Sequence, residues 1–346
     1  YSKWRHYFFI YLAKGLILMD NFRTKITAPR YSFDISHNTQ VSMIGSCFTQ
    51  NIGAALSDTK FKVEVNPFGI LFNPFSIMNA LERMLNNRPY TEAELLKASE
   101  YFVSLDHHGD FKNLEADAAL SKINERLERG RKHLLESDVV FITLGSAWVY
   151  RHIELDHIVA NCHKIPNKEF KKQLLSYQDV HLILRHIPQF MASKKITANI
   201  VFTISPIRHW KDGPVENQRS KSILHAATQA VVDEFENCHY FPIYEFMMDD
   251  LRDYRFYEQD MLHPTAQALE YIWGKFQKSF FREETQAICK EVKAIVDAAA
   301  HRPMDPESNS FQRFAKKQLD LIDQIGKKYP PLDLKAERQH FEGFLL

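Results

Sequence analysis

Ser46 is the first residue in the chain whose type and position indicate catalytic chemistry. It follows Gly45 between the apolar run VSMIG and the segment TQNIGAALSDT, which has the spacing of a helix. A serine at such a junction places its hydroxyl at the helix N-terminus, where backbone N–H groups and the helix dipole stabilise an oxyanion. The alternative is that Ser46 only caps the helix, a role that serines often fill.

Asp260 and His263 form the second group with catalytic potential. A serine hydroxyl is a weak nucleophile and needs a base within hydrogen-bond reach. The segment DMLHP supplies an imidazole and, three residues earlier, a carboxylate that can fix its tautomer. The alternative is that both residues only cap a turn, and with 16 histidines in the chain this spacing is a weak signal by itself.

The elements around these residues predict an α/β fold. The near-continuous apolar runs DVVFITLG and ANIVFTISP suit strands that are buried on both faces of a parallel sheet. Strands that alternate with helices predict a doubly wound parallel sheet. The helices are expected at residues 76–87, 91–99 (capped by Thr91), 115–136, 176–193 and 220–235, with a short strand HYFPIYE and a closing helix that has Pro264 in its first turn.

Further polar clusters follow the predicted strands. Besides Gly45-Ser46-Cys47, they are the NPFG loop at 66–69, Gly145-Ser146 and the segment from Ser205 to His209. Parallel α/β sheets bind their ligands at the carboxyl ends of the strands, so we expect these clusters to meet at one edge. Arg208 and His209 can then bind a carboxylate or phosphate of a substrate, or form a structural ion pair.

The motifs taken together resemble the GSCFA-domain family, which is related to SGNH/GDSL hydrolases. In chain order they are GSCFTQNIG, NPFGILFNP, VVFITLGSAWVY, ANCHKIP, FTISPIRHWKDG and DYRFYEQDMLHP, with Thr49 where the family name has alanine. The resemblance implies a three-layer, flavodoxin-like doubly wound sheet. It also implies Ser46 as nucleophile, His263 as base, Asp260 as its orienting carboxylate and Gly69 as a backbone oxyanion donor.

One departure from the SGNH pattern concerns the oxyanion. The third block, usually Gly-x-Asn-Asp, reads Gly145-Ser146-Ala147-Trp148 here, so the asparagine that would donate to the oxyanion is missing. Removal of one such donor costs about 3 to 4 kcal/mol of transition-state stabilisation. Asn73 is the first candidate to replace it, and Asn66, Ser146 and Arg208 are the others.

Other residues with reactive side chains have simpler structural explanations. Cys47 is expected to be a buried structural cysteine, and Cys162-His163 lacks the context of an activated thiol. His107 and His108 with Asp110 can line the mouth of the cleft or bind a metal, although a solvated loop is the simpler expectation.

Composition limits the partners and the domain organisation. The net charge of +1 and the interspersed charges argue against nucleic acid, and the four scattered cysteines suggest neither a metal site nor disulfides. We expect residues 1–18 to lie outside the fold, 19–282 to form the main domain, and 283–346 to form a helical extension that can support oligomerisation. No stable membrane insertion is expected. A cytoplasmic location is the simpler expectation unless residues 1–18 act as a signal or anchor.

The expected activity is hydrolysis of an acyl ester, for example an O-acetyl group on a carbohydrate, without metal or organic cofactor. Two alternatives remain open at this point. The first is an acyltransferase that uses the same residues with a sugar hydroxyl as acceptor. The second is a non-catalytic ligand-binding protein that retains the fold, which the missing asparagine favours.

Overall fold

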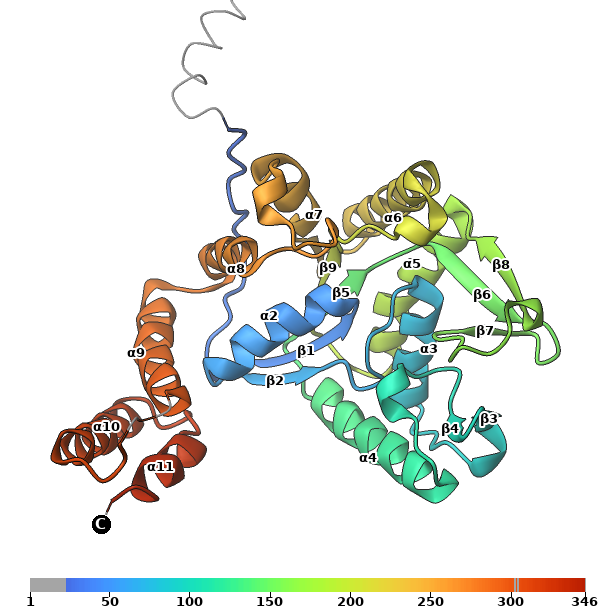
Figure 1. Ribbon diagram of the computed structural model, residues 1–346. Helices are drawn as coiled ribbons and strands as arrows, with labels where there is room; N and C mark the ends of the chain where they lie inside the picture. Colours follow the sequence, from blue (N-terminus) through green and yellow to red (C-terminus); the bar gives the residue numbers. More distant parts are fainter. Residues whose placement is uncertain (1–22, 302, 304, 346) are drawn as a thin grey trace, which may run out of the picture.

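A parallel sheet of five strands forms the centre of the molecule (Figure 1). The computed structural model describes residues 23–301, 303 and 305–345. The strand order is β10-β9-β5-β1-β2, and every neighbouring pair is parallel. This confirms the predicted doubly wound α/β fold. The strands are β1 (Gln40–Gly45), β2 (Lys62–Val65), β5 (Val139–Leu144), β9 (Asn199–Ile204) and β10 (Cys238–Tyr240).

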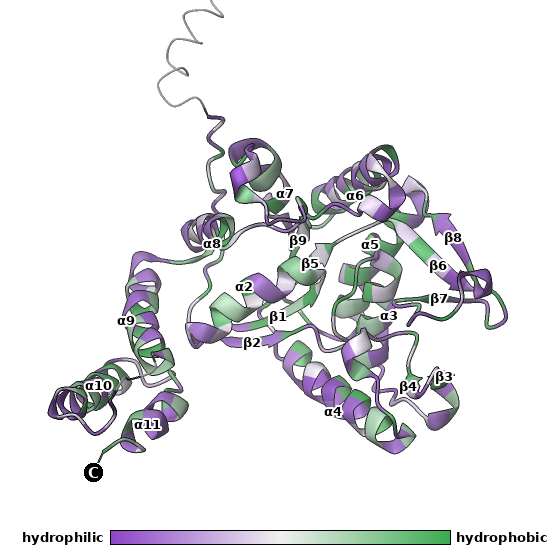
Figure 2. Ribbon diagram, viewed as in Figure 1, coloured by the Kyte–Doolittle hydropathy of each residue, from purple (hydrophilic) through white to green (hydrophobic). Residues whose placement is uncertain are grey.

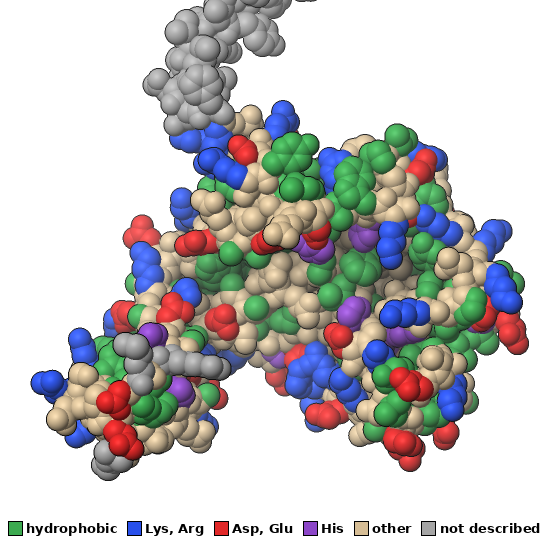
Figure 3. Space-filling view, viewed as in Figure 1, with side chains coloured by type: hydrophobic (Ala, Val, Ile, Leu, Met, Phe, Trp, Pro, Cys, Tyr) green, Lys and Arg blue, Asp and Glu red, His purple; other side chains and the backbone are tan. Residues whose placement is uncertain are grey.

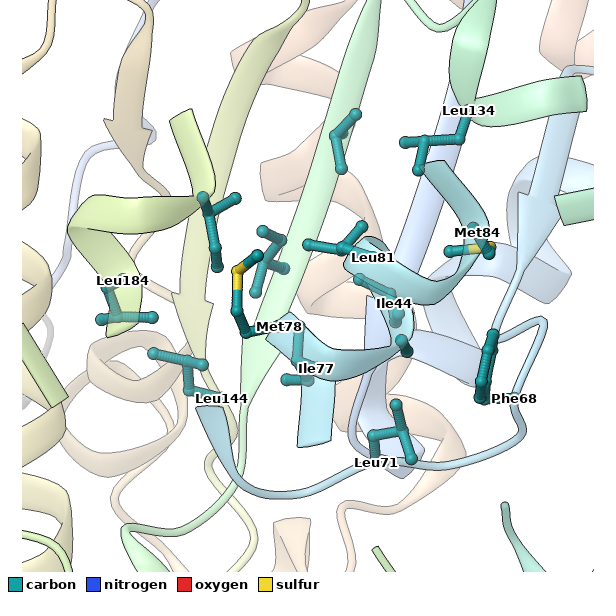
Figure 4. Packing of buried hydrophobic residues seen from close by; sticks show 14 of the residues in the cluster. Ile44, Phe68, Leu71, Ile77, Met78, Leu81, Met84, Leu134, Leu144 and Leu184 are labelled. Atoms are coloured by element: carbon teal, nitrogen blue, oxygen red, sulfur yellow. The ribbon is translucent and has the colours of Figure 1, made fainter. Parts of the chain in front are cut away.

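Helices cover both faces of this sheet. Successive strand residues point to opposite sides, so both faces carry apolar side chains that the helices bury. In β5, Phe141 packs into the apolar cluster beneath α2 and α8, whereas Ile142 packs into the cluster beneath α3 to α6. Figure 4 shows the second cluster, in which Ile44 and Leu144 of the sheet meet Ile77 of α3. The helices are α2 (Cys47–Asp58), α3 (Pro74–Leu85), α4 (Ala116–Leu135), α5 (Tyr177–Ser193), α6 (Pro214–Glu234), α7 (Ile243–Glu245) and α8 (Ala266–Phe280).

Two small antiparallel units extend the core on the side of α3. One is a hairpin and the other a three-stranded sheet with the order β7-β6-β8. The helix expected over residues 91–99 is wrong, because only one turn at Glu92–Glu94 forms after the Thr91 cap and the hairpin follows. The strands are β3 (Leu96–Ala98), β4 (Tyr101–Val103), β6 (Trp148–His152), β7 (His157–Val159) and β8 (Phe170–Leu174).

Two predicted elements near the last strand end differently in the structure. The expected strand HYFPIYE is limited to β10, because the chain turns at Pro242 into α7 and a wider helical turn over Phe246–Asp250. The closing helix α8 is capped by the hydroxyl of Thr265, which accepts from the Ala268 amide. Pro264 therefore lies before this helix and not in its first turn.

The C-terminal helices pack around an apolar cluster of their own. They are α9 (Glu283–Ala300), α10 (Asn309–Lys328) and α11 (Lys335–Glu342), and all three contribute to that cluster. Figure 2 shows hydrophobic and hydrophilic residues alternating along them, which is typical of helices with one buried face. Cys289 joins α9 to the core of the main domain, and Lys60 pairs with Glu337 at 2.6 Å.

The expectations for residues 1–18 lie outside the described residues. Within the part of the chain that the structure describes, none of the helices combines the length and apolarity that crossing a bilayer requires.

Candidate functional site

The strand order places Ser46 at the topological switch point of the sheet. The chain leaves β1 to one side toward β2 and returns on the other side as β5. Ligands of doubly wound sheets bind in the crevice that this reversal leaves outside the carboxyl ends of the strands. Ser46 follows β1 directly and Gly145 follows β5, so both lie at this crevice.

Gly45 brings Ser46 close to the neighbouring strand. Its φ of +143° and the approach of Thr143 leave no room for a side chain, since a Cβ would lie 2.2 Å from the Thr143 carbonyl oxygen. The next amide, that of Ser46, donates to the same oxygen at 3.1 Å and so extends the pairing of β1 with β5.

The hydroxyl of Ser46 makes none of the bonds that a capping serine would make. Ser46 occupies the N-cap position of α2, yet its side chain accepts no hydrogen bond from the helix. Its Oγ is buried and has no hydrogen-bond partner among the described residues. The capping alternative is therefore not realised, and the hydroxyl has no structural role in this conformation.

Asp260 holds His263 in a fixed orientation. One carboxylate oxygen of Asp260 accepts from the amides of Leu262 and His263 at 2.8 and 2.9 Å, and the other lies 2.5 Å from Nδ1 of the imidazole. These hydrogen bonds lower the pKa of Asp260 to about 2, so the carboxylate stays ionised at ordinary pH. A bridge between Tyr257 and Pro264 closes the loop that carries the pair. The carboxylate thus caps the turn and orients the imidazole at once.

The structure shows no hydrogen bond between the Ser46 hydroxyl and the His263 imidazole. The imidazole side chain is 51% exposed, whereas the Ser46 hydroxyl is buried and unpartnered among residues with described positions. The hydrogen bond that an active serine–histidine pair needs is therefore absent from this conformation. Figure 3 shows several histidine side chains near the centre of this face, around the hollow between the side of α6 and α7 and the side of β3 and β4.

Two predicted oxyanion donors are already engaged. Gly69 adopts a φ of +75°, and its N–H donates to the Asn66 carbonyl within a tight turn at 2.8 Å. Asn73 caps α3, because its Oδ1 accepts from the Ser76 amide and its Nδ2 donates to the Ser76 hydroxyl. The Asn73 amide is therefore held in the cap of α3 with one of its two N–H donors used, and the Gly69 amide is committed to its turn.

Ser146 is also occupied, whereas Arg208 is not. The Ser146 hydroxyl accepts from the Trp148 amide at 3.0 Å and lies 3.3 Å from the Ser220 hydroxyl. The guanidinium of Arg208 lies 3.7 Å from the Met248 sulfur, a weak acceptor. No carboxylate of the described residues lies within ion-pair distance of Arg208, so the alternative of a structural ion pair is not supported.

Asn66 is the candidate that keeps an unused amide donor. Its Oδ1 accepts from the Gly45 amide at 2.8 Å, which fixes the side chain beside the end of β1. Its Nδ2 is buried and finds no partner in the described part of the chain. Its φ of +46° suits asparagine, which tolerates the left-handed region better than most residues. Asn66 thus holds an unused amide donor beside Gly45, the residue before Ser46.

The expected site histidine His209 is neutral in the folded protein. Burial lowers its pKa to about 4, with a further contribution from the charge of Lys221. Its ring meets the edge of Phe72, at a centroid distance of 5.3 Å, and its amide donates to Asn217. His209 is thus held in place and can offer hydrogen bonds without a charge of its own.

Lys221 is a residue of the site that the sequence patterns did not reveal. It is fully buried and donates to the carbonyl oxygens of Gly145 and Ser205, at 2.6 and 2.7 Å. The available signal was its place in α6, three residues before the buried Leu224 and on the same inward face. A lysine on an apolar stripe departs from the expected pattern of a helix that covers a sheet.

None of the remaining reactive side chains is activated, although the solvated loop expected at His107 is wrong because that ring is buried. Burial raises the pKa of Cys47 and raises that of Cys162 to about 11, so neither environment activates a thiol. His107 is buried against Phe68, and His108 lies 2.9 Å from Asp110. In the described residues no group of His, Cys, Asp or Glu side chains forms a metal site.

Two cavities lie beside Asp110, and the smaller one adjoins the loop that carries Asn66 and Gly69. The smaller, of about 370 Å³, is lined by both residues together with Gln50 of α2. The larger, of about 860 Å³, lies between the β3–β4 hairpin and the loop around His163. Asp110 lines both cavities, whereas Ser46 and His263 line neither.

The fold and the site define a three-layer α/β protein with a serine at the switch point and an aspartate–histidine pair in the loop before α8. The chain belongs to the GSCFA family, whose model matches residues 40–276. A second model, described as the C-terminal domain of GSCFA domain proteins, matches residues 292–345. A comparison with curated proteins gives no match. The family predicted from the motifs is thereby confirmed over nearly the whole chain.

Proposed function

We propose that this protein is a serine hydrolase that cleaves an acyl ester through an acyl-enzyme at Ser46. The observation that carries the proposal is the Ser46 hydroxyl itself, which lies at the switch point and is used neither as a helix cap nor as a hydrogen-bond partner among the described residues. Buried hydroxyls are normally paired, and the exceptions call for a functional explanation.

The mechanism requires His263 to approach Ser46 when substrate binds. Catalytic hydrogen bonds are often long or unformed in ligand-free enzymes and tighten in the complex. His263 then takes the proton of Ser46 as the hydroxyl attacks the ester carbonyl, and Asp260 stabilises the imidazolium. His263 returns the proton to the leaving alcohol, and water releases the acid by the same steps in reverse.

Asn66 is the donor that we assign to the oxyanion. Its Nδ2 is the unused N–H, and its Oδ1 is held by the Gly45 amide, so the donor is fixed before the reaction begins. Such preorganised donors contribute most where water is excluded. Asn66 also lines the cavity of about 370 Å³, so a group bound there would lie beside the proposed donor.

A non-catalytic ligand-binding role is the second candidate, and one observation favours it. The backbone amide of Gly69, which was expected to hold the oxyanion, already donates to a carbonyl oxygen, and so does the amide of Ser46. A binding protein does not need free N–H donors for an oxyanion, but it still needs the crevice. An acyltransferase uses the same residues as the hydrolase and differs only in the acceptor.

Labelling with a fluorophosphonate separates these candidates. We expect wild type to form an adduct on Ser46 and to hydrolyse p-nitrophenyl acetate, whereas Ser46→Ala and His263→Ala lower kcat on the order of 10³-fold or more. Ser121→Ala, which changes an exposed serine on α4, is the matched control and stays fully active. The melting temperature of Ser46→Ala stays near wild type, because its hydroxyl has no partner to lose.

A folded wild-type protein that forms no adduct would support the binding role instead. Product analysis with and without a sugar acceptor distinguishes hydrolysis from transfer, since only a transferase yields the acylated sugar.

A further inference from the structure

Lys221 is a cation in the interior of the molecule, and the mechanism above gives it no part. Its side chain is fully buried, and Nζ bridges the carbonyl oxygens of Gly145 and Ser205. These carbonyls follow β5, the strand that pairs with β1, and β9, the next strand in the sheet. The ammonium therefore joins two strand ends at the edge of the sheet where Ser46 lies.

The burial of this charge is not compensated by a counter-ion. Within the described residues no carboxylate lies within 4.0 Å of Nζ. The titratable groups whose charges interact with Lys221 are Cys47, Arg208, His209 and His225, none of them a carboxylate. Burial of an unpaired charge is unfavourable, so stability alone does not explain a lysine at this position.

The charge of Lys221 reaches the first turn of α2. Cys47, the residue after Ser46, is the first residue of that helix. Burial raises the pKa of the Cys47 thiol, while the adjacent amides of Cys47 and Phe48 and the charge of Lys221 lower it. Burial also lowers the pKa of Lys221 to about 7, whereas its two carbonyl acceptors favour the ammonium form.

We propose that Lys221 is a positioning residue of this site, which clamps the ends of β5 and β9 beside Ser46 and holds a positive charge next to the first turn of α2. The catalytic part of this role rests on the proposed function. A fixed positive charge at the crevice favours the negative charge that develops on an oxyanion. Lys221 thereby adds an electrostatic contribution to the hydrogen bond that Asn66 donates.

The charge can be tested without any enzymatic activity. Cys47 reacts with iodoacetamide as the thiolate, so its alkylation rate at pH 6.5 reports the local potential. Peptide mass spectrometry assigns the label to Cys47. We expect Lys221→Gln and Lys221→Met to slow this reaction on the order of tenfold, and the control Lys317→Met, an exposed lysine on α10, to leave it unchanged. Equal rates in wild type and both Lys221 variants would overturn the proposal.

The catalytic part is tested by separating charge from hydrogen bonding. Lys221→Gln keeps an N–H donor for the two carbonyls but has no charge, whereas Lys221→Arg keeps the charge. We expect kcat for p-nitrophenyl acetate to fall 10- to 100-fold in Lys221→Gln with KM nearly unchanged, and Lys221→Arg to recover part of that loss. Wild-type kcat in Lys221→Gln would reduce the residue to a structural clamp and refute the positioning role.

Two further results keep the inference separate from the proposed function. If wild type shows neither turnover nor a Ser46 adduct while Cys47 alkylation still depends on Lys221, the hydrolase fails and the buried charge stands. If the variants do not fold, NMR of wild type labelled with ¹³C and ¹⁵N lysine replaces them. We expect one ammonium at pH 6 whose Nζ protons exchange slowly with water. A neutral Lys221 amine at pH 6 would contradict the proposal.

Discussion

Asn66 shows how one side chain can serve both the fold and the site. Its Oδ1 extends the pairing of β2 with β1 by accepting from the Gly45 amide, and its Nδ2 remains free. The fold uses the acceptor end of the amide, and the proposed reaction uses the donor end. A substitution that changes only the donor end can therefore separate the two roles.

Asn66→Asp makes this separation. The aspartate keeps the acceptor for Gly45 and tolerates the positive φ, but it loses the N–H and adds negative charge where the oxyanion would form. We expect the variant to fold, as judged by circular dichroism, and to lose on the order of 10²-fold in kcat for p-nitrophenyl acetate. Asn87→Asp is the control, because this exposed asparagine after α3 also has a positive φ, of +49°. Undiminished kcat in Asn66→Asp would remove Asn66 from the oxyanion site.

At the scale of elements, the sharp passage from β1 to α2 depends on Gly45. The carbonyl of Thr143 occupies the space in which a Cβ would lie, so the two strands can approach closely only without a side chain. This approach lets the Ser46 amide pair with β5 and sets the point at which α2 begins. The position of the proposed nucleophile is thus decided by a glycine that carries no chemistry.

Gly45→Ala is expected to disturb both stability and the site. A Cβ 2.2 Å from an oxygen forces the strands apart, which we expect to lower the unfolding free energy by about 2 kcal/mol or more. Gly274→Ala in α8 is the matched control, because nothing lies within 4 Å of its Cβ. Helix propensity then predicts a gain of up to about 1 kcal/mol. Urea unfolding measures both, and a stability loss of similar size in the two variants would contradict this account of Gly45.

The sequence predicted those elements that carry a long apolar run or a clear helical period of apolar residues. The runs that became β5 and β9 are apolar on both faces, and the burial of α4 repeats at helical spacing. The hairpin β3–β4 escaped prediction because LKA and YFV are too short to show alternation. Local sequence decides such short pieces less than their contacts do.

The sequence predicted individual residues of the candidate site better than it predicted the contacts between them. The Asp260–His263 pair is local in sequence, so its spacing was sufficient to find it. Lys221 and the free amide of Asn66 depend on contacts across many residues, such as the 76 positions between Lys221 and Gly145. The packed structure decides whether a side-chain donor has a hydrogen-bond partner, and a sequence motif does not contain that information.

At the scale of the whole molecule, several basic groups are buried in their neutral form. His107 lies fully inside the fold, stacked on Phe68 and within 2.8 Å of the Ser104 hydroxyl. Burial lowers the pKa of His107 to about 3 and that of His209 to about 4. Their neutral forms are compatible with the core, whereas their protonated forms are compatible mainly with the unfolded chain.

This difference predicts how His107 contributes to acid unfolding. Between its ordinary pKa of 6.5 and about 3, the unfolded state binds a proton at this residue that the folded state does not. The unfolding free energy therefore falls as the pH drops through that window, by up to about 1.4 kcal/mol per pH unit for this one proton. His107→Phe keeps an aromatic ring beside Phe68 and removes the titration. We expect its unfolding free energy, measured in urea from pH 7 to pH 4, to fall less steeply than that of wild type. The control Phe111→Leu changes a neighbour of the His107 ring and removes no titrating group, so it keeps the wild-type slope. A slope for His107→Phe equal to that of wild type would mean that His107 is protonated in the folded protein, and its buried ring would then need an acceptor other than the Ser104 hydroxyl.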